Sequence, residues 1–209
     1  MEEIKSGGMM PGAGKAGPMP IQVVDPSVSH TKFQQETESL LHGSSMHRKR
    51  GILVMDCSFP DIKLAFCAPQ IKPSPIVFAV NINFTNYDLE PLSVKFIDPF
   101  SFRLINEQEL AHKFYRKIEE GKPLQPLALG LADGTPFICL PGIREYHYHP
   151  DHSNDSWLEH RSKGGEGTLG FIVEKLHEYG IVSLNGFRVQ MAVTFPQIPL
   201  SIDPGKVAL

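Results

Sequence analysis

The sequence has few cysteines, and they are not spaced to bind a metal together. Cys57, Cys67 and Cys139 are odd in number, lie far apart and form no Cys-x-x-Cys motif. Such a set argues against a disulfide framework and indicates a reducing compartment. The same spacing excludes thiolate zinc knuckles, which need closely paired cysteines.

Long hydrophobic runs and a strong basic charge are also absent from the sequence. No apolar run reaches the roughly 20 residues that span a bilayer, and the first residues lack the apolar stretch of a secretory signal. The net charge is −3 and the pI is about 6.3, unlike a typical nucleic-acid binder. The short basic run His47–Arg50 is interpreted as the solvated end of a helix. We therefore expect a soluble, cytoplasmic protein that binds neither nucleic acid nor membrane.

Glycine, proline and methionine are instead concentrated in residues 1–30. A segment of this composition buries too little apolar surface to offset the entropy that is lost on ordering. We predict a flexible head over 1–30, one α+β domain over 31–195 with an insertion at about 100–140, and a tail over 196–209.

The period of the apolar residues indicates the order of the elements. The helix at 106–120 is predicted from Leu110, Phe114 and Ile118, which recur every four residues, with Asn106 as its cap. A helix, then a meander of about four antiparallel strands, then further helices is typical of the α+β class. We expect helices at 31–47, 106–120 and 168–179, and strands at 52–55, 62–66, 76–84, 92–97, 137–140 and 187–193.

Residues 144–161 carry the strongest functional signal, because four of the nine histidines lie there among acidic residues. Zinc accepts three or four nitrogen or oxygen donors in a tetrahedron, and neutral imidazole is its commonest nitrogen ligand. A His-x-His pair on an extended segment places both rings on one face. The segment therefore predicts a zinc site formed by His147, His149, His152 and His160.

Two other interpretations of this segment stay open. The histidines can form a hydrogen-bonded structural cluster, or they can act as acid–base groups without a metal. In each case Trp157, the only tryptophan, is expected to anchor the segment to the core. Arg144, Glu145 and Arg161 are expected to frame it as salt-bridge partners.

The order of elements over residues 31–160 resembles the ubiquitin-conjugating enzyme fold. In that family a helix precedes a four-stranded antiparallel meander whose third strand is apolar, as in Pro75–Phe84, and whose fourth contains a proline, as in Asn86–Phe96. The family also has a His-Pro-Asn motif shortly before its catalytic cysteine, and this chain has His149-Pro150-Asp151.

The chain departs from that pattern, since no cysteine follows His149-Pro150 and Glu159 stands near the expected position. It therefore resembles a diverged bacterial member, or the predicted metal-binding proteins encoded in bacterial gene clusters with ubiquitin-like modifiers. The resemblance implies protein–protein interaction with a ubiquitin-like modifier or its activating enzyme.

Three functions follow from these observations. The first, favoured by the missing downstream cysteine, is a non-catalytic protein that uses a histidine-bound zinc for local structure or docking. The second is a zinc-dependent hydrolase in which Glu159 or Asp155 serves as the general base. The third is a rearranged conjugating enzyme with Cys139 as nucleophile, although the apolar residues around Cys139 favour a buried, inert thiol.

Overall fold

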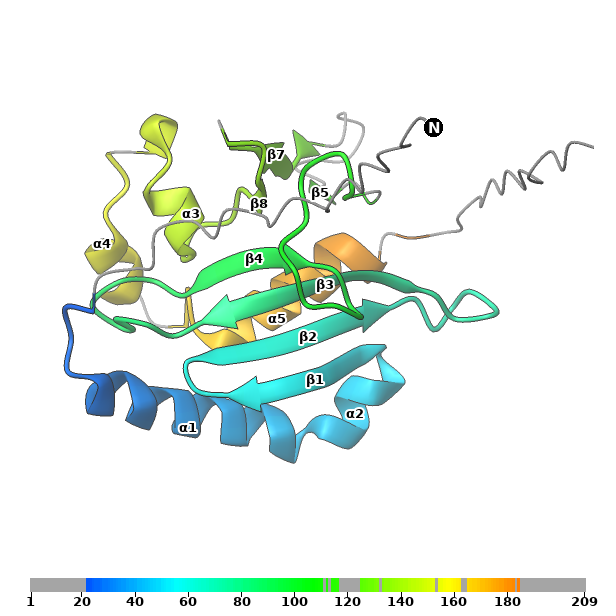
Figure 1. The fold of residues 1–209 in the computed structure, drawn as a ribbon, viewed down its shortest axis with the longest axis horizontal. Helices are drawn as coiled ribbons and strands as arrows, with labels where there is room; N and C mark the ends of the chain where they lie inside the picture. Colours follow the sequence, from blue (N-terminus) through cyan, green and yellow to red (C-terminus); the bar gives the residue numbers. More distant parts are fainter. Residues whose placement is uncertain are drawn as a thin grey trace, which may run out of the picture.

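The computed structural model describes residues 22–110, 112, 114–116, 125–131, 133–152, 154–162, 165–182 and 184. A four-stranded antiparallel sheet carries two longer helices on one face, and several short elements gather beyond its β4 edge (Figure 1). The predicted α+β class, with a helix before the meander and helices after it, is confirmed. The elements are α1 (Pro26–His42), α2 (Ser44–Lys49), β1 (Ile52–Ser58), β2 (Asp61–Cys67), β3 (Ile76–Asn83), β4 (Ser93–Ile97), β5 (Tyr115–Arg116), β6 (Gln125–Pro126), β7 (Ala128–Gly130), β8 (Pro136–Ile138), α3 (Arg144–His147), a 3-10 turn (Pro150–His152), α4 (Trp157–Ser162), α5 (Leu169–His177) and a π-helical turn (Glu178–Val182).

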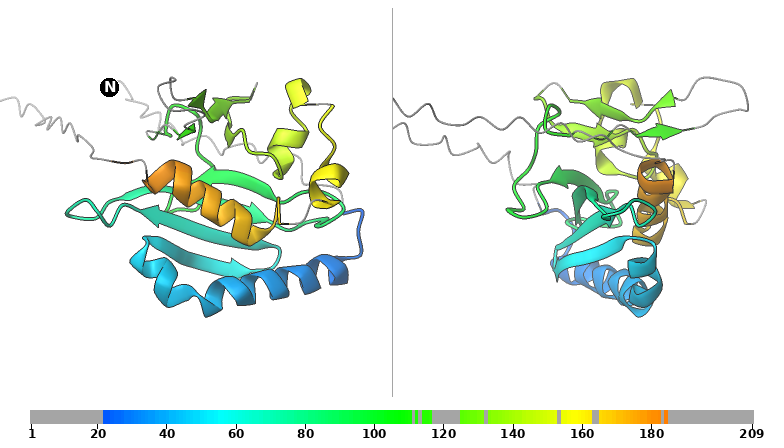
Figure 2. Two further views of the ribbon diagram at one scale, coloured as in Figure 1. Left: turned by 180° about the vertical axis from the view of Figure 1, so that it is seen from behind. Right: turned by 90° about the vertical axis from the view of Figure 1, so that its right-hand side faces the viewer.

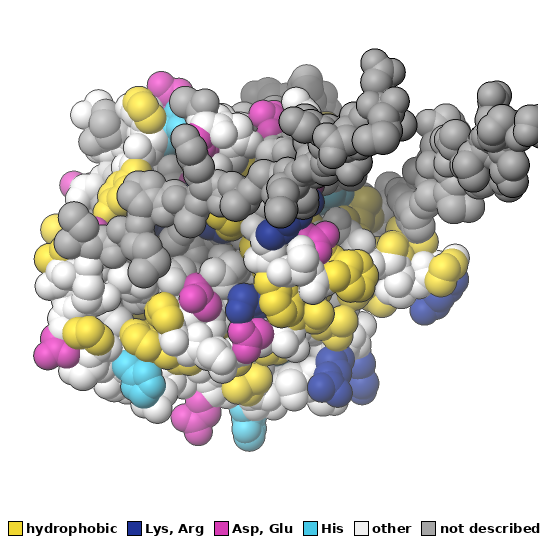
Figure 3. Space-filling model, in the orientation of Figure 1, with side chains coloured by type: hydrophobic (Ala, Val, Ile, Leu, Met, Phe, Trp, Pro, Cys, Tyr) yellow, Lys and Arg dark blue, Asp and Glu magenta, His cyan; other side chains and the backbone are white. Residues whose placement is uncertain are grey.

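The sheet is a simple meander in which each strand pairs with the next one in the chain, in the order β1-β2-β3-β4. Phe66 lies opposite Phe78 on the helix-covered face, while Lys63 lies opposite Asn81 on the other face. This alternation is what a period of two residues predicts for a sheet with one buried face. In Figure 3, drawn from the same side as Figure 1, hydrophobic side chains on the outer face lie among charged ones.

The main core lies between the sheet and the two long helices. Figure 2 shows α1 and α5 on the same side of the sheet. Phe66 and Phe78 stack with their ring centroids 4.6 Å apart, and Phe33 of α1 packs edge-to-face on Phe84 at 5.1 Å. Aromatic pairs of this kind stabilise a core beyond the area that they bury.

The first helix begins earlier than predicted and is divided in two. Pro26 occupies its first turn, where proline is well tolerated, and the Asp25 side chain accepts a hydrogen bond from Ser27 N at 2.8 Å. The helix predicted over 31–47 therefore starts at Pro26 and is interrupted at Gly43, after which α2 begins. The basic residues at the end of α2 confirm the interpretation of that run as a helix end.

The helix predicted over 168–179 is confirmed as α5. The Thr168 side chain accepts a hydrogen bond from Phe171 N, and Glu36 of α1 accepts one from Leu169 N at 2.5 Å. The hydroxyl of Tyr87 donates to the same Glu36 carboxylate at 2.7 Å. The helical backbone continues beyond residue 179, because the π-helical turn includes Gly180. A Cβ on Gly180 would lie 2.5 Å from the Phe78 ring.

The helix predicted over 106–120 is wrong for the residues described there. The Asn106 side chain accepts from Gln108 N and Glu109 N, so it closes a turn rather than capping a helix. Leu110 and Phe114 are buried as expected, but the chain then forms β5. Their spacing reflects burial against the sheet core rather than helical periodicity.

Some sequence predictions lie outside the described residues. These are Ile118, residues 1–21 of the predicted head, the strand predicted at 187–193 and the tail at 196–209. Among the described residues, no helix is both long and apolar enough to cross a membrane.

Candidate active site around Cys139

The predicted site residues lie in a series of short elements over residues 136–168, here named the site segment. It contains β8, α3, the 3-10 turn and α4. The expectation that His147 and His149 lie on one extended segment is wrong, because His147 ends α3 and the chain then turns at Pro150. The two rings consequently have different neighbours: His147 lies 5.1 Å from the His160 ring, whereas His149 stacks on Phe137 at 5.3 Å.

Two buried charged residues attach α3 to the sheet. The Glu145 carboxylate accepts hydrogen bonds from the Ser93 hydroxyl at 2.5 Å and from Val94 N at 2.9 Å, both on β4. Lys95 lies 3.3 Å from the same carboxylate. The Arg144 guanidinium donates to carbonyl oxygens in the 85–91 turn and lies 3.5 Å from the Glu90 carboxylate. The prediction that both residues frame the segment by ionic contacts is confirmed, and they also make α3 a fixed base.

Trp157 connects α4 to the core, as the sequence predicts. The residue is 8% exposed, and its indole N–H donates to the Asp88 carbonyl at 3.1 Å. Arg161, one turn further on, pairs with the Asp88 carboxylate at 3.0 Å. Gly167 has a φ of +75°, and a Cβ at that position would lie 2.5 Å from the indole ring. The close approach of the 165–168 loop to Trp157 therefore requires glycine.

Both ring nitrogens of His147 are used by the backbone. Nδ1–H donates to the Asp155 carbonyl at 2.8 Å, and Nε2 accepts from Gly142 N at 3.1 Å. Burial lowers the pKa of His147, which favours the neutral ring that this pair of hydrogen bonds requires. In this conformation neither nitrogen is free to bind a metal.

His160 lies between two carboxylates. Its Nε2 is 2.5 Å from Oδ1 of Asp155, and its Nδ1 is 2.6 Å from Oε2 of Glu166. Although burial of the ring opposes protonation, hydrogen bonds to Glu166 and Asp155 raise the pKa of His160. A protonated ring donates from both nitrogens, so His160 serves as the ionic link between the turn before α4 and the loop after it.

His152, the last residue of the 3-10 turn, contacts a cysteine. Its Nε2 lies 3.3 Å from Sγ of Cys139, the residue that follows β8. One face of the His152 ring stacks on Tyr146, with centroids 3.9 Å apart and planes at 19°. Burial raises the pKa of the Cys139 thiol, while the nearby charge of Arg116 on β5 lowers it. The site thus pairs a half-buried thiol with an imidazole that can take its proton.

The structure therefore separates the four predicted ligands rather than placing all of them around one point. His147 and His160 form one group with Asp155, while His149 and His152 lie toward Cys139. Among the described residues, no group of three or more histidine, cysteine, aspartate or glutamate side chains is arranged to hold a metal. Glu159 is exposed on α4. The zinc site stays a prediction.

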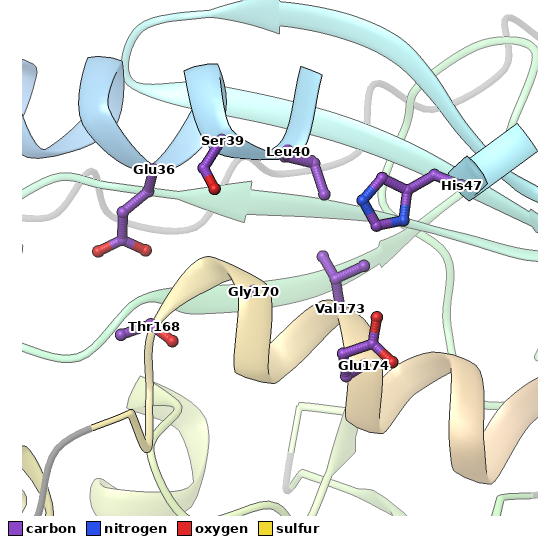
Figure 4. Close-up of a pocket in the computed structure, with 8 residues that line it drawn as sticks. All are labelled: Glu36, Ser39, Leu40, His47, Thr168, Gly170, Val173 and Glu174. Carbon is purple, nitrogen blue, oxygen red and sulfur yellow. The ribbon is translucent and has the colours of Figure 1, made fainter. Parts of the chain in front are cut away.

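A cleft of about 370 Å³ lies between α1, α2 and α5, in a different part of the molecule (Figure 4). Its two carboxylates are already engaged, since Glu36 accepts from Tyr87 and Leu169 while Glu174 forms a bidentate pair with Arg50. His47 points into the same space from α2 (Figure 4). This arrangement explains how α5 is held against α1 and α2.

The family model described as the Y4jH family matches residues 24–129 and 127–184 of the chain. The chain belongs to the Y4jH family. Within this family, a protein of Sinorhizobium fredii named y4jH is 37% identical over 189 residues, which cover 83% of this chain and 92% of that protein. The matched residues include β8, α3 and the turn that carries His152.

Sequence reasoning found Cys139 and His152 separately but missed that they form a pair. They are 13 residues apart, and that separation alone carries no signal. The sequence carries no signal for Tyr146, because a tyrosine next to a histidine is typical of ordinary packing.

Proposed function

We propose that this protein transfers acyl groups through a thioester on Cys139, with His152 as general base. The observation that carries the proposal is the 3.3 Å between the thiol sulfur and Nε2 of His152. A nucleophile and a base within hydrogen-bond reach are the signature of covalent catalysis. This corresponds to the third function that the sequence left open, with the histidines used for acid–base chemistry.

In the proposed step, the Cys139 sulfur attacks the carbonyl carbon of an activated acyl group. The thiol proton passes to Nε2 of His152 as the sulfur–carbon bond forms. The leaving group then departs with the electron pair of its bond to that carbon. Because burial raises the pKa of the thiol, the base is needed at the moment of attack, as a ready-made thiolate is disfavoured.

The resemblance to ubiquitin-conjugating enzymes supports a macromolecular acyl group. In that family the modifier's carboxyl terminus is passed from an activating enzyme to a cysteine that lies after the meander. Cys139 also lies after β4, although before His149-Pro150 rather than beyond it. We propose that the acyl group is the carboxyl terminus of a ubiquitin-like modifier and that the activating enzyme of this modifier is the upstream partner.

A direct test uses p-nitrophenyl acetate with the full chain. We expect a rapid release of p-nitrophenolate with acetylation of Cys139, which hydroxylamine reverses, as thioesters require. Cys139→Ser should abolish this release, and His152→Gln should slow it about a hundredfold at neutral pH. Cys67→Ser is the matched control, because Cys67 is also half-buried but lies on β2. Acetylation that persists unchanged in Cys139→Ser would refute the proposal.

The two zinc-based functions are tested on the same samples by elemental mass spectrometry. About one zinc per chain that is lost in a His149→Ala/His152→Ala variant would support a zinc site. If the zinc-loaded protein then hydrolyses the ester without acetylating Cys139, the hydrolase replaces the present proposal. If it binds zinc and shows neither reaction, the non-catalytic function replaces it.

A further inference from the structure

We infer, on the basis of the proposed function, that Tyr146 is the positioning residue that holds His152 against Cys139. A general base acts only when its nitrogen is directed at the proton that it takes. His152 lies at the end of a three-residue turn, Pro150–His152, which has little regular structure to fix a side chain. The orientation of the ring therefore depends on its neighbours.

The backbone under Tyr146 is rigid. The two preceding residues are Arg144 and Glu145, which are 8% and 7% exposed and attach α3 to β4 and to the 85–91 turn. Tyr146 is itself 8% exposed. Its ring is thus a fixed surface at the edge of the site.

The His152 ring lies flat on that surface. A centroid distance of 3.9 Å and an angle of 19° describe nearly parallel rings in contact. This contact fixes the plane of the imidazole, and Nε2 then lies 3.3 Å from the Cys139 sulfur. Among the described residues, no carboxylate or carbonyl is found to accept from Nδ1 of His152. Stacking thus takes the part that a third hydrogen-bonding group has in a catalytic triad.

Asp155 connects Tyr146 to the turn that carries His152. The Tyr146 hydroxyl donates to Oδ2 of Asp155 at 2.7 Å, and Asp155 N donates to the His152 carbonyl at 2.9 Å. The other oxygen of that carboxylate, Oδ1, lies 2.5 Å from Nε2 of His160, whose Nδ1 is in turn 2.6 Å from the Glu166 carboxylate. Asp155 therefore links the two stacked residues, with its side chain bonded to Tyr146 and its backbone N–H bonded to His152.

The test measures the rate at which iodoacetamide alkylates Cys139 in the full chain across a range of pH, followed by peptide mass spectrometry. Tyr146→Leu removes the stack and should lower the rate at neutral pH at least about tenfold, toward that of His152→Gln. At high pH the thiol ionises without help, and the variant should regain the wild-type rate. Tyr146→Phe keeps the stacked ring but loses the hydroxyl's hydrogen bond to Asp155, so its rate should fall less than that of Tyr146→Leu. Tyr148→Leu is the control, because Tyr148 is adjacent and 62% exposed.

The outcomes separate the two claims. If His152→Gln reacts like wild type at every pH, the proposed function fails. If His152→Gln is slow at neutral pH but Tyr146→Leu is not, only the positioning role fails. A rate in Tyr146→Leu that is lower by the same factor at all pH values would indicate a structural effect and would also overturn the inference.

A measurement on the wild-type chain covers the case in which Tyr146→Leu does not fold. Parallel stacking places the His152 ring protons in the shielding region of the tyrosine ring, so their proton resonances should lie upfield of those of the exposed His42. His152→Gln assigns the signals. Resonances at the positions of an exposed histidine would show that the stack does not form in solution.

Discussion

The sheet with α1 and α5 differs from the site segment in how it is held together. In the first region long elements share backbone ladders and a core of phenylalanines, including Phe66 and Phe84, which are fully buried. In the second, helices of four and six residues reach that core through Tyr146 and Trp157 and are otherwise attached by polar side chains. Glu145, Asp155 and His160 make several of these polar contacts.

This difference indicates which interactions fix the geometry of the side chains in the proposed site. The hydrophobic effect is not directional, so apolar burial does not by itself fix the orientation of a polar group. A network of charged hydrogen bonds fixes one geometry when every member is satisfied and loses it when one member fails. We therefore expect the site segment to unfold before the sheet, and Trp157, the only tryptophan, reports on it separately.

The largest expected effect comes from the sheet. Phe66→Ala removes a fully buried ring that stacks on Phe78, and it should lower the free energy of unfolding by about 3 to 5 kcal/mol. Both regions depend on the sheet. The urea unfolding transitions measured by circular dichroism and by tryptophan fluorescence should therefore move together to lower urea concentration. A shift in the fluorescence alone would contradict this dependence.

A smaller effect is expected in the site segment. Gly167→Ala places a methyl group against the Trp157 ring and adds strain at a φ of +75°, and it should cost about 2 to 4 kcal/mol of local stability. The fluorescence transition should move to lower urea than the circular dichroism transition.

Gly165→Ala provides the matched control for that change. Gly165 also has a positive φ, +85°, but a Cβ there would meet no atom within 4 Å. The variant should lose only about 1 kcal/mol, since it introduces the backbone strain without the clash. Equal losses in the two variants would show that contact with Trp157 does not limit residue 167.

The smallest effect is a pH dependence on the sheet side of the comparison. His177 on α5 faces Arg50, Glu174 and, more distantly, His47; its Nε2–H donates to the Arg50 carbonyl at 3.1 Å. Burial lowers the pKa of His177, and the charge of Arg50 lowers it further. The unfolded chain therefore takes up the proton first. The contribution of His177 is complete above its unfolded value of 6.5 and is lost as the pH falls through the lower folded pKa.

Urea midpoints between about pH 5 and 8 test this dependence in wild type and in His177→Gln. We expect the variant to be less stable at pH 8 and its midpoint to fall less steeply toward pH 5. Parallel curves for the two proteins would show that His177 is not buried in its neutral form.

The same division separates what the sequence predicts from what it does not. Helix α5 follows from Leu169, Ile172 and Leu176 on one face, and the β3 strand follows from its β-branched and aromatic residues. Local pattern and tertiary packing agree there. At Leu110 and Phe114 they disagree, since both residues are buried and neither lies in a helix.

In the site segment, the identity of the residues was predictable and their grouping was not. The four histidines and Trp157 stand out by composition, and the anchoring role of Trp157 is confirmed. Which histidine meets which partner depends on the turn after α3, and that turn is set by contacts from Asp155 to His147 and His152. No periodicity in the sequence encodes such contacts.

The hydrogen bond from Leu169 N to Glu36 has a consequence for the order in which the chain folds. It joins residues 133 positions apart, so α5 receives this cap only after nearly the whole described chain has been synthesised. Until then the phenylalanines on the inner face of the sheet are covered on the α1 side only. Contacts of such separation slow folding, and the nascent chain carries an uncovered apolar surface while the site segment is still being made.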